Sequence, residues 1–278
     1  MPEASASLRP RTLVVVAGTG TEVGKTWVAV RLLAALREQG YRVAARKPAQ
    51  SFAASDARET DAALLGAASG EPAERVCPRE RWYELAMAPP MAAAALGRPA
   101  FALADLAREI AASWPRPAVD VGLVELAGGP RSPLAGDGDG ADLIRALLPE
   151  LVVLVADAGL GTLNAVRLAA DVIAPASTLV HLNRFDSADA LHRSNREWLE
   201  GRWMLDVSGE EGALAAALVA RLPRWCRHCG SKAGACGGAC ARPFDPPRFC
   251  PRCARKLRVQ VVPTGHSAVC QEHGALRD

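Results

Sequence analysis

The chain has 278 residues, of which 50% are hydrophobic and 23% are charged, a balance that is ordinary for a globular protein and excludes general disorder. The charge is unevenly spread: residues 223–278 carry ten Lys and Arg against three Asp and Glu, a net +7, which leaves −4 for the rest of the chain. No apolar run has membrane-spanning length, and the polar start leads into a glycine-rich loop rather than a cleavage site. We therefore expect a cytoplasmic protein.

Buried strands and amphipathic helices alternate along the first part of the chain. Residues 12–18, TLVVVAG, form a β-branched apolar run ended by glycines, which predicts a strand buried on both faces. From Lys25 to Gln39 apolar residues recur at helical spacing, and Gly40 follows where a helix would end. Further strands are predicted in YRVAARKPA, broken at Pro48, and in residues 121–129, 151–159 and 177–185, with a helix from Leu163 to Ile173.

This alternation predicts an α/β fold with a mostly parallel sheet covered by helices on both faces, similar to that of P-loop NTPases. The segment AGDGDG, residues 135–140, is predicted to be a flexible loop. Apolar periodicity stops after residue 222. We therefore expect a P-loop domain at 1–222 and a small Cys-rich module at 223–278.

GTGTEVGKT, residues 18–26, has the composition of a phosphate-binding loop but not its usual spacing. The pattern G-x-x-x-x-G-K-[ST] requires a glycine where Thr19 stands. In such a loop, backbone N–H groups at the start of a helix cradle phosphate oxygens, with help from the helix dipole. Lys25 would then reach the terminal phosphates and Thr26 would ligate Mg²⁺.

The displaced glycine is also found in one enzyme family, because GTGTEVGKT resembles the loop G-T-[DG]-T-x-V-G-K-T of the dethiobiotin synthetases. Other segments resemble that family in the same order, over most of residues 12–222. They are RKPAQS (46–51), TDAALL (60–65), VELAGG (124–129), GTLN (161–164) and Asn183 at the end of a strand.

The resemblance implies a ligase that closes the ureido ring of dethiobiotin from 7,8-diaminononanoate and CO₂, with ATP and Mg²⁺, in biotin biosynthesis. One amine captures CO₂ as a carbamate, the carbamate attacks the γ-phosphate of ATP, and the second amine displaces phosphate from the mixed anhydride. Positioning and charge neutralisation dominate such phosphoryl chemistry. The resemblance also implies a homodimer.

Roles for individual residues follow from the same resemblance. Lys25 and Lys47 would be catalytic and neutralise the carbamate and the transferring phosphoryl group, while Thr26, Asp61 and Glu125 would hold Mg²⁺ through hard oxygen ligands. The nucleotide would be bound by Glu22, Val23, Gly24, Lys25, Thr26, Trp27, Asp61, Glu125, Gly128 and Asn183, the last reading the adenine. The diamine would be bound by Ser51, Gly161 and Asn164, the last two across the dimer interface.

Two residues depart from the family pattern. Phe52 and Leu126 stand where the family usually has glycine, and both are expected to add bulk beside the site. The related cobyrinate amide synthases share the loop type, but they carry a glutaminase domain with a nucleophilic cysteine and histidine. The Cys-rich tail is far too small to be such a domain.

Seven of the eight cysteines fall between Cys226 and Cys270, which in a cytosolic chain indicates metal binding rather than disulfides. Two C-x₂-C knuckles separated by twenty residues have the spacing of a zinc ribbon, and the remaining donors would form a second, Cys₃His site. Spacing leaves Zn²⁺ and an iron–sulfur cluster both open. The first expected set is Cys226, Cys229, Cys250 and Cys253, and the second is Cys236, Cys240, Cys270 and His273. Residues 256–270 are expected to form two strands around a turn at Pro263 to Gly265.

The tail also resembles, through FCPRCARKLRVQVVPTG and C-x-x-H-G, the small Cys-rich auxiliary protein that accompanies biotin synthase in actinobacteria. The resemblance implies that the module assists biotin synthase, an iron–sulfur enzyme that acts on dethiobiotin. An alternative is a P-loop nucleotide switch whose basic ribbon binds nucleic acid or a protein partner. The tail has few aromatic residues for stacking and no evident recognition helix, and salt-dependent binding would distinguish the two interpretations.

Overall fold

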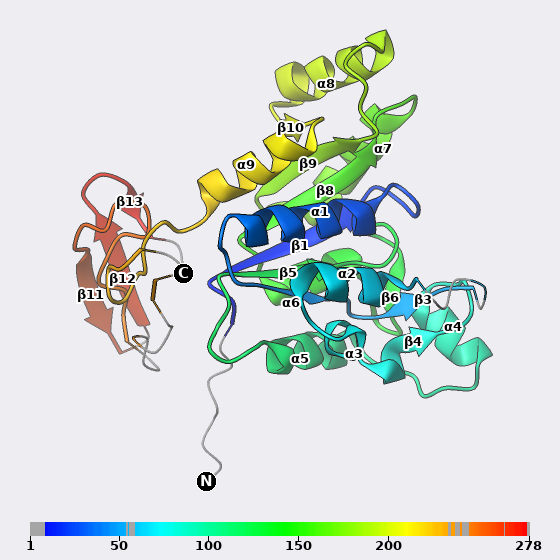
Figure 1. Cartoon of the computed structure of the whole chain (residues 1–278), viewed down its shortest axis with the longest axis horizontal. Coiled ribbons are helices and arrows are strands. Elements are labelled where there is room, and N and C mark those ends of the chain that lie inside the picture. Colours follow the sequence, from blue (N-terminus) through cyan, green and yellow to red (C-terminus); the bar gives the residue numbers. More distant parts are fainter. Residues whose placement is uncertain are drawn as a thin grey trace.

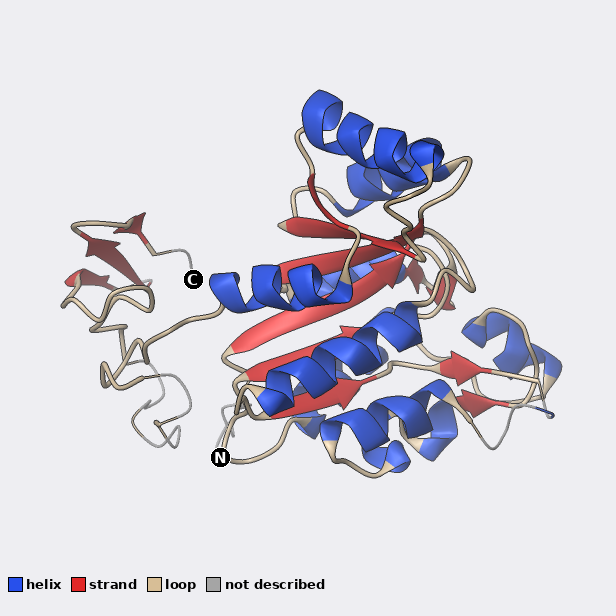
Figure 2. Cartoon of the chain, turned by 45° about the horizontal axis from the view of Figure 1, so that its top comes forward, coloured by secondary structure: helices blue, strands red, loops and turns tan. Residues whose placement is uncertain are grey.

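A six-stranded parallel sheet forms the centre of the computed structural model, which describes residues 9–53, 55, 59–232, 235, 236, 240, 245–263 and 265–276. Its strand order is β10-β9-β8-β1-β5-β2, and every pairing in it is parallel (Figures 1 and 2). The strands are β1 (Thr12–Gly18), β2 (Val43–Arg46), β5 (Val121–Glu125), β8 (Leu151–Asp157), β9 (Thr178–Asn183) and β10 (Asp206–Ser208). The mostly parallel sheet predicted from the sequence is confirmed.

Helices cover both faces of the sheet because its central strands are apolar on both sides. In β1, Val14 and Val16 belong to the core beneath one layer of helices, and Val15 belongs to the core beneath the other. Each such side chain contributes about 1.5–3 kcal/mol when it leaves water. The first layer contains α1 (Lys25–Glu38), α2 (Asp61–Ser69), α3 (Ala73–Val76) and α9 (Glu211–Arg221). The second contains α5 (Leu103–Ser113), α6 (Gly140–Leu147), α7 (Thr162–Ile173) and α8 (Ala190–Trp203).

Short elements extend the carboxyl edge of the sheet. Strands β3 (Gln50–Ser51) and β4 (Trp82–Tyr83) pair in parallel, and the 3₁₀ turn η2 (Arg79–Arg81) and helix α4 (Pro89–Ala95) lie near them in the chain. Within the described ranges, no helix is both long enough and apolar enough to cross a membrane.

The expected flexible loop at residues 135–140 is wrong. Strands β6 (Pro133–Ala135) and β7 (Gly138–Asp139) form an antiparallel hairpin that leads directly into α6. The Asp139 carboxylate accepts a hydrogen bond from Asp142 N at 3.0 Å, and the Asp142 carboxylate accepts one from Asp139 N at 3.1 Å. The Gly and Asp residues of the segment therefore make a turn and a helix cap rather than an open loop.

A separate three-stranded antiparallel sheet occupies the tail. It contains β11 (Arg258–Val262), β12 (Gly265–Cys270) and β13 (Gly274–Ala275), so the two expected strands are confirmed. In the described part of the tail, the buried apolar residues are one proline, one alanine and four cysteines, namely Pro247, Ala268, Cys226, Cys236, Cys250 and Cys270. The tail thus has almost no apolar core. Its division from the rest of the chain at 222/223 stays a prediction.

The tail contacts the sheet at the amino ends of its strands. Arg11 precedes β1 and donates a hydrogen bond to the carbonyl of Cys236, and its guanidinium lies 3.5 Å from Asp120, which precedes β5. The seven residues of β1 span about 20 Å, so the glycine-rich loop at the other end of this strand is about that far away. Figure 1 shows the tail near the start of β1 and the glycine-rich loop at the opposite end of that strand.

Candidate active site

The glycine-rich loop connects β1 to α1 and requires a glycine directly before the helix. Gly24 has φ 94°, in the left-handed region, and a Cβ there would lie 2.0 Å from the side-chain nitrogen of Asn183. That nitrogen donates a hydrogen bond to Val23 O at 2.9 Å. Asn183 at the end of β9 thus holds the loop in place. The N–H groups of the first turn of α1 remain available to a phosphate.

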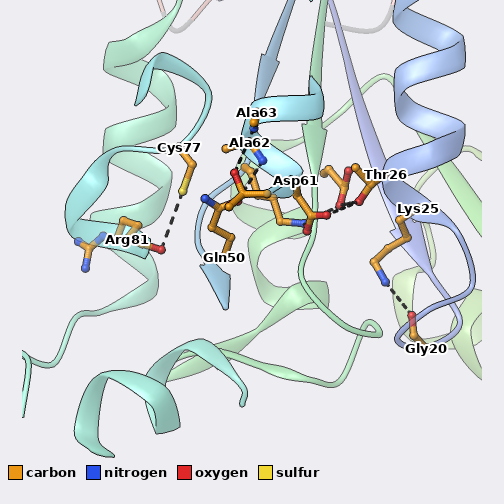
Figure 3. A network of polar contacts seen from close by, with 12 residues as sticks. Gly20, Lys25, Thr26, Gln50, Asp61, Ala62, Ala63, Cys77 and Arg81 are labelled. Atoms are coloured by element: carbon orange, nitrogen blue, oxygen red, sulfur yellow. Dashed lines mark hydrogen bonds and ion pairs between the residues drawn. The ribbon is translucent and has the colours of Figure 1, made fainter. Parts of the chain in front are cut away.

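Lys25 turns back over the loop. Its Nζ donates a hydrogen bond to Gly20 O at 2.7 Å, as Figure 3 shows. Burial lowers the pKa of Lys25, and the nearby Lys47 lowers it further. A lysine held against the loop in this way carries its charge to the position where terminal phosphates of a bound nucleotide would lie.

Four side chains from separate segments converge beside the start of α1. Thr26 Oγ1 lies 2.9 Å from Asp61 Oδ1 and 2.8 Å from Glu125 Oε1. Lys47 Nζ donates to Glu125 Oε1 at 2.5 Å and forms an ion pair with Asp61. Parallel strands bring these groups together, because Glu125 ends β5 and Lys47 follows β2 at the same edge of the sheet. We call these four residues the Lys47 cluster.

One cation meets two carboxyl groups in the Lys47 cluster, and the Asp61 side chain is 39% exposed to water. Lys47 is 3% exposed and Glu125 is 0% exposed. Burial lowers the pKa of Lys47, but Glu125 and Asp61 outweigh burial and raise it above its usual value. Burial likewise opposes the ionisation of Asp61, and Lys47 outweighs it and lowers the pKa of that carboxyl. Lys47 therefore stays protonated, whereas burial raises the pKa of the Glu125 carboxyl that it contacts.

The start of α2 positions Asp61. Thr60 caps the helix by accepting from Ala63 N at 3.3 Å, and Gln50 Oε1 accepts from Ala62 N at 3.0 Å. Figure 3 shows Gln50 beside the first residues of this helix, with Asp61 directed toward Thr26. The neighbouring Ser51 has a buried hydroxyl oxygen without a partner among the described residues. A buried hydroxyl without a partner is suited to hydrogen-bond a substrate.

Most of the chain is similar to proteins of known family. A family model described as an AAA domain matches residues 12–181. The ATP-dependent dethiobiotin synthetase BioD from Anaeromyxobacter dehalogenans is 36% identical over 226 residues, which cover 74% of this chain and 97% of the relative. This chain belongs to the dethiobiotin synthetase family. It is therefore an enzyme, an ATP-dependent ligase with a role in biotin biosynthesis.

Two other dethiobiotin synthetases named BioD are more similar over shorter stretches. The one from Methylobacterium nodulans is 41% identical over 159 residues, covering 54% of this chain and 69% of that protein. The one from Pseudomonas paraeruginosa is 43% identical over 166 residues, covering 57% and 69%. Among solved structures, the signal recognition particle receptor FtsY from Elizabethkingia anophelis has a TM-score of 0.45 at 13% identity, covering 72% of this chain and 60% of that one, which is too distant to bear on function.

The side chains of the Lys47 cluster fit a magnesium ion. The Thr26 hydroxyl lies within hydrogen-bond distance of both the Asp61 and the Glu125 carboxyl groups, so three hard oxygen donors meet at this point. The second carboxylate oxygen of Glu125 is buried without a partner among the described residues, which leaves a free lone pair at this point. Oxygen donors of this kind are the ligands that Mg²⁺ prefers.

The remaining expected site residues lie around the same edge. Glu22 and Trp27 are exposed, and Gly128, with φ 68°, lies in the loop after β5. Gly161 and Asn164 are exposed at the start of α7, the helix that follows β8. The Asn183 amide bonds the loop at Val23, so its expected adenine contact stays a prediction that would use the carbonyl oxygen of the side chain.

The side chains of Phe52 and Leu126, which depart from the dethiobiotin synthetase pattern, pack outside the Lys47 cluster. Leu126 is fully buried in the core beneath the second helical layer, where its Cδ1 approaches Gly140. Phe52 packs edge-on against Trp82 at a centroid distance of 6.2 Å. Neither residue has a positive φ, so neither position needs glycine for its backbone.

Sequence reasoning missed two residues of this edge. Gln50 binds the start of α2, and its position directly before Ser51 in RKPAQS was the available signal. Arg184 donates to Glu22 O at 3.0 Å and pairs with Asp157 at 2.8 Å, so it joins the glycine-rich loop to the end of β8. No spacing in the sequence indicated that contact.

The expected grouping of the tail cysteines is wrong. The donor atoms of Cys226, Cys229, Cys236 and Cys240 gather in one set, and those of Cys250, Cys253, Cys270 and His273 gather in another. The sequence grouping joined the two C-x₂-C knuckles, whereas in the structure each knuckle meets the donors that follow it. Local closure is physically favoured because short loops lose less entropy.

Proposed function

We propose that this chain closes the ureido ring of dethiobiotin from 7,8-diaminononanoate and CO₂ with hydrolysis of ATP to ADP and phosphate. The observation that carries the proposal is the convergence of Thr26, Lys47, Asp61 and Glu125 beside the glycine-rich loop. Two lysines and a hard-oxygen cation site at one edge form the charge arrangement that phosphoryl transfer to a carbamate requires.

Each residue then has a defined task. The loop N–H groups and Lys25 bind the phosphates, and Lys47 attracts the carbamate that forms when one amine of the diamine adds to CO₂ and loses a proton. The carbamate oxygen bonds to the γ-phosphorus as the bond to ADP breaks. The second amine then attacks the carbamoyl carbon and loses a proton as phosphate leaves. Thr26, Asp61 and Glu125 would hold Mg²⁺, which would supply positive charge beside the phosphates, and Ser51 orients the diamine or its carbamate.

The direct test measures dethiobiotin by mass spectrometry after incubation of the purified chain with 7,8-diaminononanoate, bicarbonate and Mg-ATP. Replacing Lys47 with alanine should lower the rate at least about 100-fold, because it removes the cation that faces the developing charge. Lys256→Ala is the matched control, since this exposed lysine lies in the tail. Product formation by Lys47→Ala at the control rate would refute the assigned role, and ATP turnover without dethiobiotin in the unaltered chain would refute the substrate.

The proposal includes a homodimer in which Gly161 and Asn164 complete the diamine site of the partner subunit. Their exposure at the start of α7 leaves them accessible to a second copy. Mixing and reassociating inactive Lys47→Ala and Asn164→Ala chains should restore about a quarter of the activity, because half of the dimers would then contain one intact site. If activity stays at the level of the separate variants, Asn164 does not act across an interface.

The tail is proposed to serve a step other than ring closure, with biotin synthase as its partner. Its contact with the sheet is at the amino ends of the strands, remote from the Lys47 cluster. Deleting residues 224–278 should leave dethiobiotin formation unchanged and weaken growth that depends on biotin synthesis. Unchanged growth would count against the partner, and steeply salt-dependent binding of the tail to DNA or RNA would favour the regulator instead.

A further inference from the structure

The two donor sets of the tail have the dimensions of single-ion sites. Within each set, one donor atom from each of four residues lies within 4.8 Å of the other three. In a tetrahedral zinc site, Zn–S bonds of about 2.3 Å and Zn–N bonds of about 2.0 Å place two sulfurs about 3.8 Å apart and a sulfur and a nitrogen about 3.5 Å apart. These values are the edges of the expected tetrahedron.

The second set matches those edges. The sulfurs of Cys253 and Cys270 are 3.8 Å apart, and His273 Nδ1 lies 3.5 Å from Cys250 and 3.6 Å from Cys270. None of these sulfurs is in a disulfide, which requires a separation of about 2.05 Å. The sulfurs of the first set lie closer together than these edges, with Cys240 at 3.4 Å from Cys226 and 3.1 Å from Cys236.

The two knuckles also share one backbone geometry, although their surroundings differ. Cys226 N donates to Ser231 O at 2.7 Å, and Cys250 N donates to Arg255 O at 2.8 Å. The residue after the second cysteine is left-handed in both, with φ 73° at Gly230 and φ 58° at Ala254. An alanine is rarely found in this region unless its surroundings hold it there. The second knuckle therefore has the backbone geometry of the first although Ala254, rather than a glycine, adopts the left-handed conformation.

The tail lacks another source of stability. Its described buried apolar residues are Pro247, Ala268 and four of the cysteines themselves, while Val261 and Val269 on its strands are 69% and 44% exposed. A segment of this size cannot hold its backbone in place without an apolar core, a cross-link or a metal ion. The seven tail cysteines are all free, so no disulfide supplies the cross-link.

We propose that the tail binds two separate zinc ions, one in a Cys₄ site of Cys226, Cys229, Cys236 and Cys240 and one in a Cys₃His site of Cys250, Cys253, Cys270 and His273. Each ion has four protein ligands and no open position, which makes both sites structural rather than catalytic. An iron–sulfur cluster is a poorer fit, because it distributes its cysteines over several irons and spreads them further apart. This inference is independent of the proposed reaction.

Metal content of double variants tests both the number of ions and their grouping. The full chain, purified under reducing conditions with zinc supplied, should contain two zinc ions. Cys229→Ser with Cys236→Ser should retain one ion, because both changes fall in one set. Cys229→Ser with Cys253→Ser should retain none, because the changes fall in different sets. Grouping by knuckle, as the spacing alone suggests, predicts the opposite pair of results and would overturn the assignment.

Spectroscopy and folding give a second readout. Cobalt in place of zinc should give thiolate-to-metal absorption in the full chain, and His273→Ala should reduce the tetrahedral cobalt bands whereas His266→Ala should not. ATP binding by each variant reports whether the rest of the chain remains folded. Iron with acid-labile sulfide instead of zinc, fewer than two ions in the unaltered chain, or equal effects of the two histidine variants would each refute the proposal.

Discussion

Replacing Gly24 by alanine is expected to strain the glycine-rich loop twice. The first strain is in the backbone, since φ at Gly24 is 94° and an alanine in the left-handed region costs about 1–2 kcal/mol. The second is steric, because the added Cβ would lie 2.0 Å from the Asn183 side-chain nitrogen. That amide must move and give up its hydrogen bond to Val23 O, a loss of about 1 kcal/mol.

The sum predicts that Gly24→Ala lowers the free energy of unfolding by about 2–3 kcal/mol. The loop must also shift to make room, so we expect ATP affinity to fall at least about tenfold, which corresponds to about 1.4 kcal/mol. Urea unfolding followed by fluorescence measures the first quantity, and calorimetric titration with ATP measures the second.

Gly40 offers the matched control. It has φ 83°, it follows the end of α1, and a Cβ there would meet no atom within 4 Å. Gly40→Ala should therefore show the backbone penalty alone, about 1–2 kcal/mol, with unchanged ATP affinity. Adding Asn183→Ala to Gly24→Ala removes the steric conflict, so the two changes should together cost less than the sum of their separate effects. Equal behaviour of the Gly24 and Gly40 variants, or strict additivity in the double variant, would refute this account of the loop.

Three further predictions concern titratable groups. Burial lowers the pKa of His181 from 6.5 to about 4. The neutral ring therefore contributes stability above pH 6.5 that is lost as the pH falls toward 4. His181→Leu should remove this part of the pH dependence of the free energy of unfolding. The pKa of Asp61 is held below its ordinary 3.8 by Lys47, which outweighs burial, so its contribution is lost only as the pH falls below 3.8, and unfolding of Asp61→Asn should vary less with pH in that range. Burial raises the pKa of the Cys77 thiol to about 12, and peptide mapping after alkylation at pH 8 should find this cysteine unmodified until the chain is unfolded.

The nucleotide loop was predictable because its signals are local. The strand at 12–18 is the observed β1, and the helix expected from Lys25 to Gln39 is observed from Lys25 to Glu38. A β-branched run, a glycine turn and helical periodicity are adjacent in the chain, so no long-range contact is needed to interpret them. The same holds for strands β11 and β12, while Thr264 of the turn expected between them lies outside the described residues.

Contacts between residues far apart in the chain were harder to predict from the sequence. Resemblance named Asp61 and Glu125 as partners of Thr26, but their meeting depends on sheet order, with β5 beside β1 and α2 packed over β2. Leu126 was expected beside the site because spacing does not state the direction of a side chain; the alternation along the sheet turns it into the core. The grouping of the tail cysteines failed for a related reason, since equivalent knuckles offer more than one way to share eight donors.

The contact of Arg11 with Asp120 and Cys236 determines which part of the chain is suited to attachment on a surface. Because the tail contacts the sheet at the amino ends of the strands, attaching the protein through its tail would leave the carboxyl edge of the sheet exposed to solvent. Immobilising the chain on a sensor surface through residues of β11 should therefore keep the nucleotide loop open to small molecules. Coupling through exposed residues of α7 or α8 would instead bring the surface close to the end of β8 and β9.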